Sequence, residues 1–307
     1  MPVLRPSGSD FTSFVKAAAQ YVPAGRAGKT SKSGGVSVPL PGLGAFVRAS
    51  QVGALASPTT SAVIINGVTP PRSGGAAPVG FRPSTVGLAM WLDGADPAGT
   101  GVAPAGNSTL TTWVDKSGSG NNASGGVSPT WNSNAVQFDG TKYLSTPCPA
   151  GTNTAAYFFV WSQTTVSGSQ QSILGGNALG TAALITLPSQ PVFGDWNSAI
   201  IEVPSVIAAG STYLASAGAG GGTVSYGLNG STMYSASHTF SGTGTFTVGA
   251  GYIDNRSKLF GSINEILVYN ITLNTTQRQT VEGYLAWKWG VQASLPAGHP
   301  FKTAAPT

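Results

Sequence analysis

The segment Thr276–Phe301, TQRQTVEGYLAWKWGVQASLPAGHPF, constrains the fold of this chain more than any other part of the sequence. Val281, Leu285 and Trp289 recur at four-residue spacing, which places one apolar stripe along a short helix. A helix of this length is stable mainly when such a stripe packs on other structure. We therefore expect a short C-terminal helix that lies against a core.

The residues around this helix predict where it begins and ends. Asn274 or Thr275 can cap its start, and Gly290 can take the left-handed conformation that ends it. The helix directly follows a long apolar segment, KLFGSINEILVYNITL, at positions 258–273. Together they predict a closing strand followed by a capped helix.

Short apolar segments recur through residues 86–307 at intervals typical of strands. TFTVG alternates cleanly, so we expect Phe246 and Val248 to point inward and Thr245 and Thr247 outward. AAYFFVWS and EILVY are apolar on both sides and predict central strands that are covered on both faces. After the opening segment VGLAMWLDGADPAG, the expected strands are Leu110–Val114, Ala135–Phe138, Ala155–Ser162, Ala182–Leu187, Ala199–Val203, Ser211–Ser216, Thr223–Leu228, Thr245–Gly249 and Leu259–Asn270.

About ten short strands, Gly- and Asn-rich turns and one late helix predict an all-β fold, a two-sheet antiparallel jelly-roll sandwich. Hydrophobic residues make up 41% of the chain, enough for a sizeable core. The 43 glycines and 21 prolines stay below the share expected of low-complexity chains, roughly 25–30%, and so indicate turns. Charged residues make up only 8%, against roughly 25% in ordinary globular proteins. Such a surface is poorly protected against self-association, which favours a protein that lives in an assembly.

Charge and texture divide the chain near residue 85. Residues 1–85 hold eight basic side chains and one acidic side chain, a net charge of +7, whereas residues 86–307 hold seven basic and nine acidic side chains. The first part is broken by segments rich in Gly, Pro and Ser and has no apolar run long enough for a core of its own. We therefore predict an extended basic arm over 1–85 and one β-sandwich domain over 86–307.

The arm has one segment with helical spacing, SDFTSFVKAAAQYVP, which ends at Pro23. Its Phe11 and Phe14 are expected to dock on a partner surface. SAVIING, at positions 61–67, is expected to form an added edge strand. The basic residues Arg26, Lys29 and Lys32 follow the helical segment without interleaved aromatic residues, so they favour contact with protein surfaces over nucleic acid.

Three segments of the second part resemble laminin G-like (concanavalin A-like) domains. These are MWLDGADPAG with TLTTWVDKSGSGNNAS in 90–124, VQFDGTKYL at 136–144, and FGSINEILVYNITLNTTQRQTVEGYLAWKWG at 260–290. The resemblance covers roughly residues 86–301. It implies a concanavalin A-like jelly roll with a short C-terminal helix.

The arm is similar to the opening of minor capsid proteins of large nucleocytoplasmic DNA viruses, through SDFTSFVKAAAQYVP and the Gly/Ser/Lys stretch that follows. This resemblance implies a minor capsid (cement) protein of the virion that docks on the major capsid protein and other minor capsid proteins, assembled in the host cytoplasm. The alternative that the fold suggests is a lectin-like, carbohydrate-binding module on a particle or cell surface.

Catalytic patterns are missing from the sequence. Glycoside hydrolysis needs two carboxylates flanking the scissile bond, but Glu202, Glu265 and Glu282 are each isolated from other acids. Glu265 in its apolar strand is expected to be a structural acceptor, for example to Lys288. His238 and His299 have no nucleophile motif nearby, and we expect structural or solvated roles for both. The sequence therefore indicates a protein that is not an enzyme.

Metal, cofactor and membrane signals are weak or missing. Asp93, Asp96, Asp115, Asn121, Asn122 and Asp254 could supply oxygen ligands to calcium, but their segments are equally typical of capped turns, so we expect no metal and no cofactor. Cys148 is the only cysteine, which excludes an internal disulfide and favours folding in a reducing compartment. No apolar run reaches the ~18 residues of a membrane span, and the first residues do not form a signal peptide.

Tryptophans are the remaining candidates for sugar contact. Most of the seven lie at expected strand or helix positions and predict core packing. Trp131 and Trp196 are flanked by Asn, in TWNSN and DWNSA, and are the best candidates for stacking on a glycan ring. Core packing is the competing interpretation for both.

Overall fold

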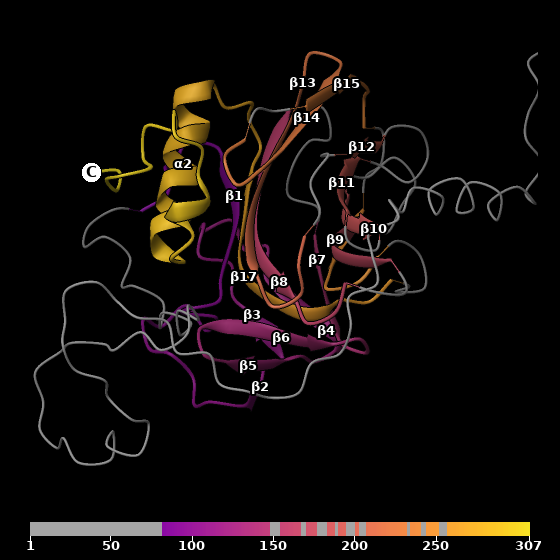
Figure 1. Ribbon diagram of the computed structural model, residues 1–307. Coiled ribbons are helices and arrows are strands. Elements are labelled where there is room, and N and C mark those ends of the chain that lie inside the picture. Colours follow the sequence, from indigo (N-terminus) through magenta and orange to yellow (C-terminus); the bar gives the residue numbers. More distant parts are fainter. Residues whose placement is uncertain are drawn as a thin grey trace, which may run out of the picture. The chain divides into compact units, whose positions relative to one another are not determined.

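The computed structural model describes the chain from residue 82 to its C-terminus, with several gaps (Figure 1). The described residues are 82–147, 154–166, 170–176, 183–187, 190–194, 200–202, 207–231, 234–240, 244–251 and 257–307. The predicted arm residues Phe11, Phe14, Arg26, Lys29 and Lys32 and the predicted edge strand at 61–67 lie outside them. The boundary at 85/86 therefore stays a prediction.

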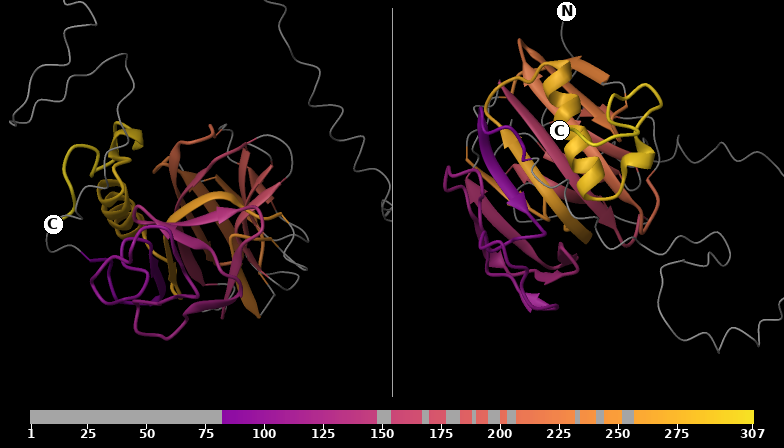
Figure 2. Two further views of the ribbon diagram at one scale, coloured as in Figure 1. Left: turned by 90° about the horizontal axis from the view of Figure 1, so that it is seen from below. Right: turned by 90° about the vertical axis from the view of Figure 1, so that its left-hand side faces the viewer.

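One face of the sandwich is a nine-stranded sheet with an outer surface that helix α2 partly covers (Figures 1 and 2). Its central strand β17 pairs with β8 along one side and with β6 and then β1 along the other. In sheet order the strands are β15 (Tyr234–Ser237), β14 (Thr223–Leu228), β13 (Thr212–Gly220), β8 (Ala155–Gln163), β17 (Phe260–Tyr269), β6 (Ala135–Asp139), β5 (Thr130–Asn132) and β2 (Ser108–Thr109), with β1 (Leu88–Asp93) beside β17.

The opposite face is an eight-stranded sheet. In order its strands are β12 (Ile200–Glu202), β11 (Gln190–Gly194), β10 (Ala183–Leu187), β9 (Gln171–Gly176), β16 (Thr245–Val248), β7 (Tyr143–Pro147), β4 (Ala123–Val127) and β3 (Thr112–Trp113). Every strand pairing described is antiparallel. The structure thus confirms the predicted two-sheet antiparallel sandwich with a C-terminal helix.

Strand β8 shows why its sequence is apolar on both sides. Tyr157, Phe159 and Trp161 point into the core between the two sheets, because alternate residues of a strand face the same side. Phe158 and Val160 point the other way, into a second apolar cluster beneath α2. The prediction of central strands covered on both faces is therefore confirmed, and the helix supplies the second cover.

Helix α2 runs from Thr275 to Lys288 and is capped as the sequence predicts. Asn274 accepts from the Gln277 N–H at 2.9 Å, and the Gln277 side chain accepts from the Asn274 N–H at 2.9 Å, which forms a capping box. Gly290 lies just beyond the helix with a φ of 72°, in the left-handed region. A short 3-10 turn, η2 (Gln292–Ser294), begins the tail that folds back over the helix.

One local expectation needs correction. Phe246 and Val248 face the core as predicted, but Thr247, expected to point outward, is also buried in β16, a central strand that pairs with β9 and β7. In the glycine-rich run at 218–222, β13 extends through Gly220, so Gly221 and Gly222 make the turn to β14. The longer β13 places Gly218 and Gly220 within the sheet, which matters for the site described next.

Candidate functional site

An open groove of about 600 Å³ lies on the outer surface of the nine-stranded sheet, between the β13–β14 hairpin, the start of α2 and the C-terminal tail. Its floor comes from β8, β13 and β14, and its walls come from the segment before α2, the first turns of α2 and the tail. The lining residues are Ala156, Ala217, Gly218, Ala219, Gly220, Thr223, Ser225, Gly230, Ser231, Thr272, Leu273, Thr275, Arg278, Gln279, Pro296, Gly298 and His299.

Small side chains on the floor create this groove. Gly218 pairs with Ala156 on one side and with Ser225 on the other, so three adjacent strands carry small residues at the same level. A Cβ atom added to Gly218 would meet the Ser225 Oγ at 3.2 Å, and one added to Gly220 would meet the Thr272 Oγ1 at 2.6 Å. Ser225 and Thr272 therefore approach the two glycines closely, and the floor carries only small side chains where other parts of the sheet carry large apolar ones.

A buried carboxylate holds the helix wall and the tail wall together. Glu282 of α2 is fully buried, and its Oε1 accepts from the Ser216 hydroxyl of β13 and from Nη1 of Arg278, both at 2.5 Å. Its Oε2 lies 3.1 Å from Nε2 of His299 in the tail. One carboxylate thus links the sheet, the helix and the tail behind the groove.

The imidazole of His299 is fully engaged in this arrangement. Its Nδ1 accepts from the Phe301 N–H at 3.2 Å, which assigns the ring proton to Nε2, facing Glu282. The side chain is buried. His299 therefore has the structural role that the sequence analysis favoured, as part of the groove wall.

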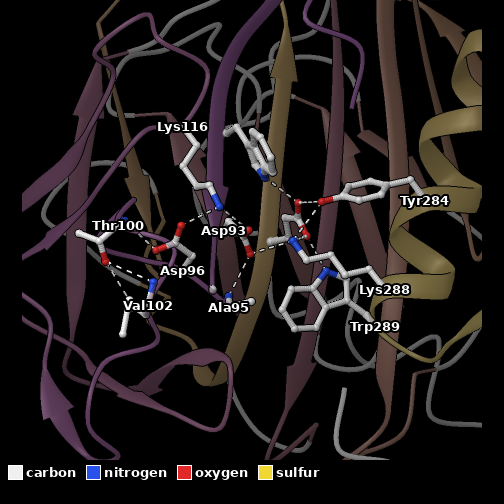
Figure 3. A network of polar contacts seen from close by, with 12 residues as sticks. Asp93, Ala95, Asp96, Thr100, Val102, Lys116, Tyr284, Lys288 and Trp289 are labelled. Atoms are coloured by element: carbon white, nitrogen blue, oxygen red, sulfur yellow. Dashed lines mark hydrogen bonds and ion pairs between the residues drawn. The ribbon is translucent and has the colours of Figure 1, made fainter. Parts of the chain in front are cut away.

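The C-terminal half of α2 contacts the same sheet surface through a buried ionic network (Figure 3). Nζ of Lys288 lies 2.8 Å from Oδ1 of Asp93 and 2.8 Å from Oε2 of Glu265. Nζ of Lys116 lies 2.9 Å from both Asp93 and Asp96. Two ammonium groups therefore alternate with three carboxylates from β1, β17 and the loop after β1.

Glu265 is the most enclosed member of this network. Besides Lys288, its carboxylate accepts from the indole N–H of Trp91 at 2.7 Å, from the indole N–H of Trp289 at 2.6 Å and from the hydroxyl of Tyr284 at 3.0 Å. This confirms the expectation that Glu265 is a structural acceptor partnered by Lys288. The network joins β17, β1 and α2, and its centre at Glu265 is fully buried, so it serves the fold.

Burial and the lysines shift the two central carboxylates in opposite directions. Burial raises the pKa of Glu265 above its ordinary value, and the nearby charge of Asp93 adds to this rise against the pull of Lys288. For Asp93 burial also acts upward, but attraction and hydrogen bonds from Lys288 and Lys116 outweigh it and hold its pKa below 3.8. Burial, together with Glu265, raises the pKa of the Tyr284 hydroxyl far above its usual range.

The candidate calcium ligands within the described residues have other partners. Asp93 and Asp96 pair with Lys116, and Asp96 also accepts from the Thr100 N–H at 2.9 Å. Asp115 accepts from the Trp91 and Asn121 N–H groups, at 2.8 Å and 2.9 Å. The Asn121 side chain donates to the Ala89 carbonyl at 2.8 Å, and the Asn122 side chain accepts from the Asp115 N–H at 2.8 Å. Asp254 lies outside the described residues. The described side chains thus take part in turns and local contacts, the competing role that the sequence analysis gave them.

Of the two tryptophans expected to stack on a glycan, Trp131 lies within the described residues. Trp131 lies in the core cluster, only 5% exposed, with its indole N–H bonded to the Gly94 carbonyl at 2.6 Å. In this position its ring has no face open to a sugar. Trp196 and Cys148 lie outside the described residues.

Within the described ranges, no three His, Cys, Asp or Glu side chains gather in a way that could hold a metal ion. No described helix is long and apolar enough to cross a membrane. His238, expected to be solvated or structural, stacks edge-on against Phe240 with ring centroids 5.2 Å apart.

The groove residues Arg278 and Gln279 were not anticipated from the sequence. Two signals could have pointed to them. The run ASAGAG at 215–220 places small residues at six successive positions of a strand, and Arg278 and Glu282 stand four residues apart on a helix, the spacing of an ion pair. Neither signal by itself says that the helix start lies over the small residues.

Comparison with known proteins gives distant structural likeness only. No family model and no curated protein matches the chain. Among solved structures it is similar to the Trypanosoma rangeli sialidase in complex with sialic acid (14% identity, TM-score 0.49, 71% of this chain and 35% of the sialidase). It is also similar to domain 4 of the Geobacillus stearothermophilus arabinanase AbnA in complex with arabinotriose (14%, 0.42, 62% and 95%) and to the CBM40 of the Ruminococcus gnavus IT-sialidase (15%, 0.38, 43% and 83%).

The chain spans about a third of the length of the sialidases it matches. The assignment of this domain to the concanavalin-like, jelly-roll β-sandwiches stands on its own two sheets and their strand order. The two sheets therefore support a β-sandwich fold.

Proposed function

We propose that this protein is a carbohydrate-binding module and that the groove beside α2 is its binding site. The observation that carries the proposal is the open groove of about 600 Å³ on the sheet surface. Its volume lies within the range of small-molecule sites, about 300–1,000 Å³. The groove offers enough hydrogen-bonding groups for a sugar, because its walls combine hydroxyl, amide and guanidinium groups.

The chemistry of the lining suits sugar hydroxyls. Each hydroxyl of a sugar both donates and accepts, so a matching site must offer groups of both kinds. Thr223, Ser225 and Thr272 supply hydroxyls, Gln279 supplies an amide with a donor and an acceptor end, and Arg278 supplies donors. The small floor residues let a ring approach the sheet backbone closely.

The lining also supports a binding role without catalysis. None of the residues that line the groove is Asp or Glu. The nearest carboxylate that the structure ties to the lining, Glu282, is fully buried and already bonded to Ser216, Arg278 and His299. A pair of carboxylates flanking a scissile bond, which glycoside hydrolysis needs, is therefore not offered by these residues.

A glycan array followed by calorimetry on the full chain tests the proposal. We expect at least one glycan class to bind and Gln279→Ala to weaken that binding about tenfold, the loss of roughly 1.4 kcal/mol. Gln137→Ala is the matched control, because Gln137 lies on β6 of the same sheet but does not line the groove. Binding that is lost equally in both variants, or no binding at all, would contradict the groove as a sugar site.

The second candidate is a structural virion component, a minor capsid protein that docks on the major capsid protein and other minor capsid proteins. It is favoured by the charge distribution: an arm of net charge +7 precedes a domain in which acidic side chains slightly outnumber basic ones. An arm of this kind that orders on binding can cover a large surface. The proposed location is the capsid shell, with assembly in the host cytoplasm.

Limited proteolysis with mass spectrometry on the full chain tests this second candidate. We expect rapid loss of residues 1–85 and a resistant fragment beginning near Val86. An arm that resists the protease throughout would mean that it packs on its own domain, which contradicts an arm that awaits capsid neighbours. Absence of the protein from purified virions of its source would also exclude this function.

A further inference from the structure

We propose that the groove selects glycans that carry an oxyanion, such as a uronate carboxylate or a sulfate ester, and that Arg278 is the residue that recognises this group. The inference rests on the proposed carbohydrate-binding function and narrows its ligand class. It depends on the position of Arg278, on what holds its guanidinium, and on which charges face the groove.

Arg278 is the cationic residue of the groove. It lies in the first turns of α2, and about a fifth of its side chain (19%) is exposed. His299, the other basic residue of the lining, has both ring nitrogens engaged with Glu282 and Phe301. A ligand in the groove therefore meets one guanidinium as its charged partner.

The guanidinium is held in place from behind. Its Nη1 donates to Glu282, which is itself fixed by Ser216 of β13 and His299 of the tail. Side-chain entropy that an exposed arginine would lose on binding has thus already been lost on folding. A guanidinium has five N–H donors in a rigid fork, and the bond to Glu282 uses Nη1. The other donors can form the paired hydrogen bonds that carboxylates and sulfates accept.

The charges around the groove favour an anion in spite of Glu282. Glu282 pairs with Arg278, but its carboxylate is fully buried and is not among the residues that line the groove. Coulomb energy falls with distance, so a ligand oxyanion in contact with the guanidinium is attracted more than Glu282 repels it. No carboxylate lines the groove, and the first turn of α2 contains no acidic residue. A neutral sugar would leave the remaining guanidinium donors without an anionic acceptor in the groove.

Calorimetry on the full chain with four probes tests the inference: methyl β-D-glucuronide, methyl β-D-glucoside, glucose 6-sulfate and inorganic sulfate. We expect the glucuronide or the sulfated sugar to bind at least tenfold more tightly than the glucoside, and this preference to weaken as salt is raised. Which of the two acidic sugars binds more tightly identifies the oxyanion.

Variants separate recognition by Arg278 from general damage to the groove. Arg278→Gln should reduce the ratio of the affinities for the acidic and the neutral sugar to about one. Arg278→Lys keeps the charge and a partner for Glu282, so it should retain part of the preference for the acidic sugar. Gln279→Ala should weaken the acidic and neutral sugars alike and leave their ratio unchanged. Thermal unfolding of each variant checks the fold, and the Lys variant carries the test if the Gln variant is unstable.

The outcomes distinguish this inference from the proposed function. Equal binding of glucoside and glucuronide would overturn the selection of acidic glycans while leaving carbohydrate binding intact. A preference that survives in Arg278→Lys and Arg278→Gln alike would remove Arg278 from the recognition. Binding of inorganic sulfate with no binding of any sugar would overturn the carbohydrate-binding function itself.

Discussion

The two halves of α2 lie on the same sheet, yet one half is sealed and the other borders a groove. The C-terminal half packs on large residues of the sheet, including Phe158, Leu267 and Tyr269, and its Lys288 enters the ionic network. The N-terminal half lies over Gly218 and its small neighbours. The helix is regular throughout, so the difference comes from the sheet beneath it.

This comparison shows how a single cover can serve both stability and binding. Where strand side chains are large, they fill the space under the helix and exclude water, which stabilises the fold in proportion to the apolar area buried. Where they are reduced to Gly, Ala and Ser, the groove remains. Each half also uses a buried carboxylate, Glu265 or Glu282, and the one that holds a residue of the groove lining, Arg278, is Glu282.

The largest effect is expected from breaking the sealed half with Glu265→Gln. Two donors face each oxygen of Glu265, so the amide NH₂ of glutamine would confront donors in either orientation. We expect a loss of about 3–5 kcal/mol in the free energy of unfolding, as for other broken buried ion pairs. Urea denaturation measures this, with the exposed Asp139→Asn as control, for which we expect less than about 1 kcal/mol. Equal losses in the two variants would mean that the network contributes nothing special.

Filling the groove with Gly218→Val should abolish binding while leaving the sealed half intact. The new Cβ requires only a small shift of the Ser225 hydroxyl, and the side chain then occupies the groove floor. We expect glycan binding to weaken more than tenfold, about 1.4 kcal/mol or more, with little change in the unfolding midpoint. Gly106→Val is the matched control, because a Cβ there meets only Asn132 Oδ1 at 3.7 Å and lies outside the groove. Undiminished binding in Gly218→Val would place the sugar elsewhere.

The pH dependence of the sealed half should follow Asp93. Its pKa in the folded state is below the ordinary 3.8, so its contribution to stability is present above that pH and is lost as the pH falls through the folded value. The cost of Asp93→Asn should therefore shrink in strong acid, which urea denaturation from pH 6 to below 3.8 can follow. Glu265, whose pKa is raised above 4.5, has the opposite sign: its contribution is complete below that pH and declines above it. If the loss of unfolding free energy caused by Asp93→Asn grew in acid, the lowered pKa of Asp93 in the folded state would be wrong.

The smallest effect is expected at the open half, from Asn274→Ala. This substitution removes the hydrogen bond that the Asn274 side chain accepts from the Gln277 N–H, and loss of such a cap typically costs about 1 kcal/mol. Thr275 and Arg278 lie in the first turns of the helix and line the groove. Fraying of the helix start should therefore also loosen the groove wall and weaken binding modestly. Thr276→Ala controls for a change in the same turn outside the cap. Hydrogen exchange at the helix start distinguishes the two, and equal protection in both variants would argue against the cap.

Much of the fold was predictable because it depends on local pattern. Apolar segments such as Ala155–Ser162 and Thr223–Leu228 gave strands close to those observed, and Asn274 and Gly290 predicted both ends of α2. The strands β2, β4, β5, β9, β11 and β15 were not predicted as separate elements. They are short or rich in polar residues and Gly, and are specified by pairing with neighbouring strands more than by their own sequence.

The site was less predictable because it depends on contacts between distant residues. The sequence identified Glu265 and Lys288 as partners, since a lone acid in an apolar strand needs a cation. It offered Trp131 as a sugar platform, but only tertiary packing decided that this indole turns into the core toward Gly94. Nothing local distinguishes a strand tryptophan that faces the core from one that faces solvent when both neighbours are polar.

The sequence by itself therefore determined the β-sandwich, its capped closing helix and the charge contrast between residues 1–85 and the rest, since these follow from periodicity, capping and composition. Only the tertiary structure decided that the small residues of β13 lie beneath the first turns of α2 and that Glu282 joins Arg278, Ser216 and His299. The reason is physical: a groove is a relation between surfaces that the chain brings together from positions far apart, and no local preference of residues 216, 278 or 299 encodes that meeting.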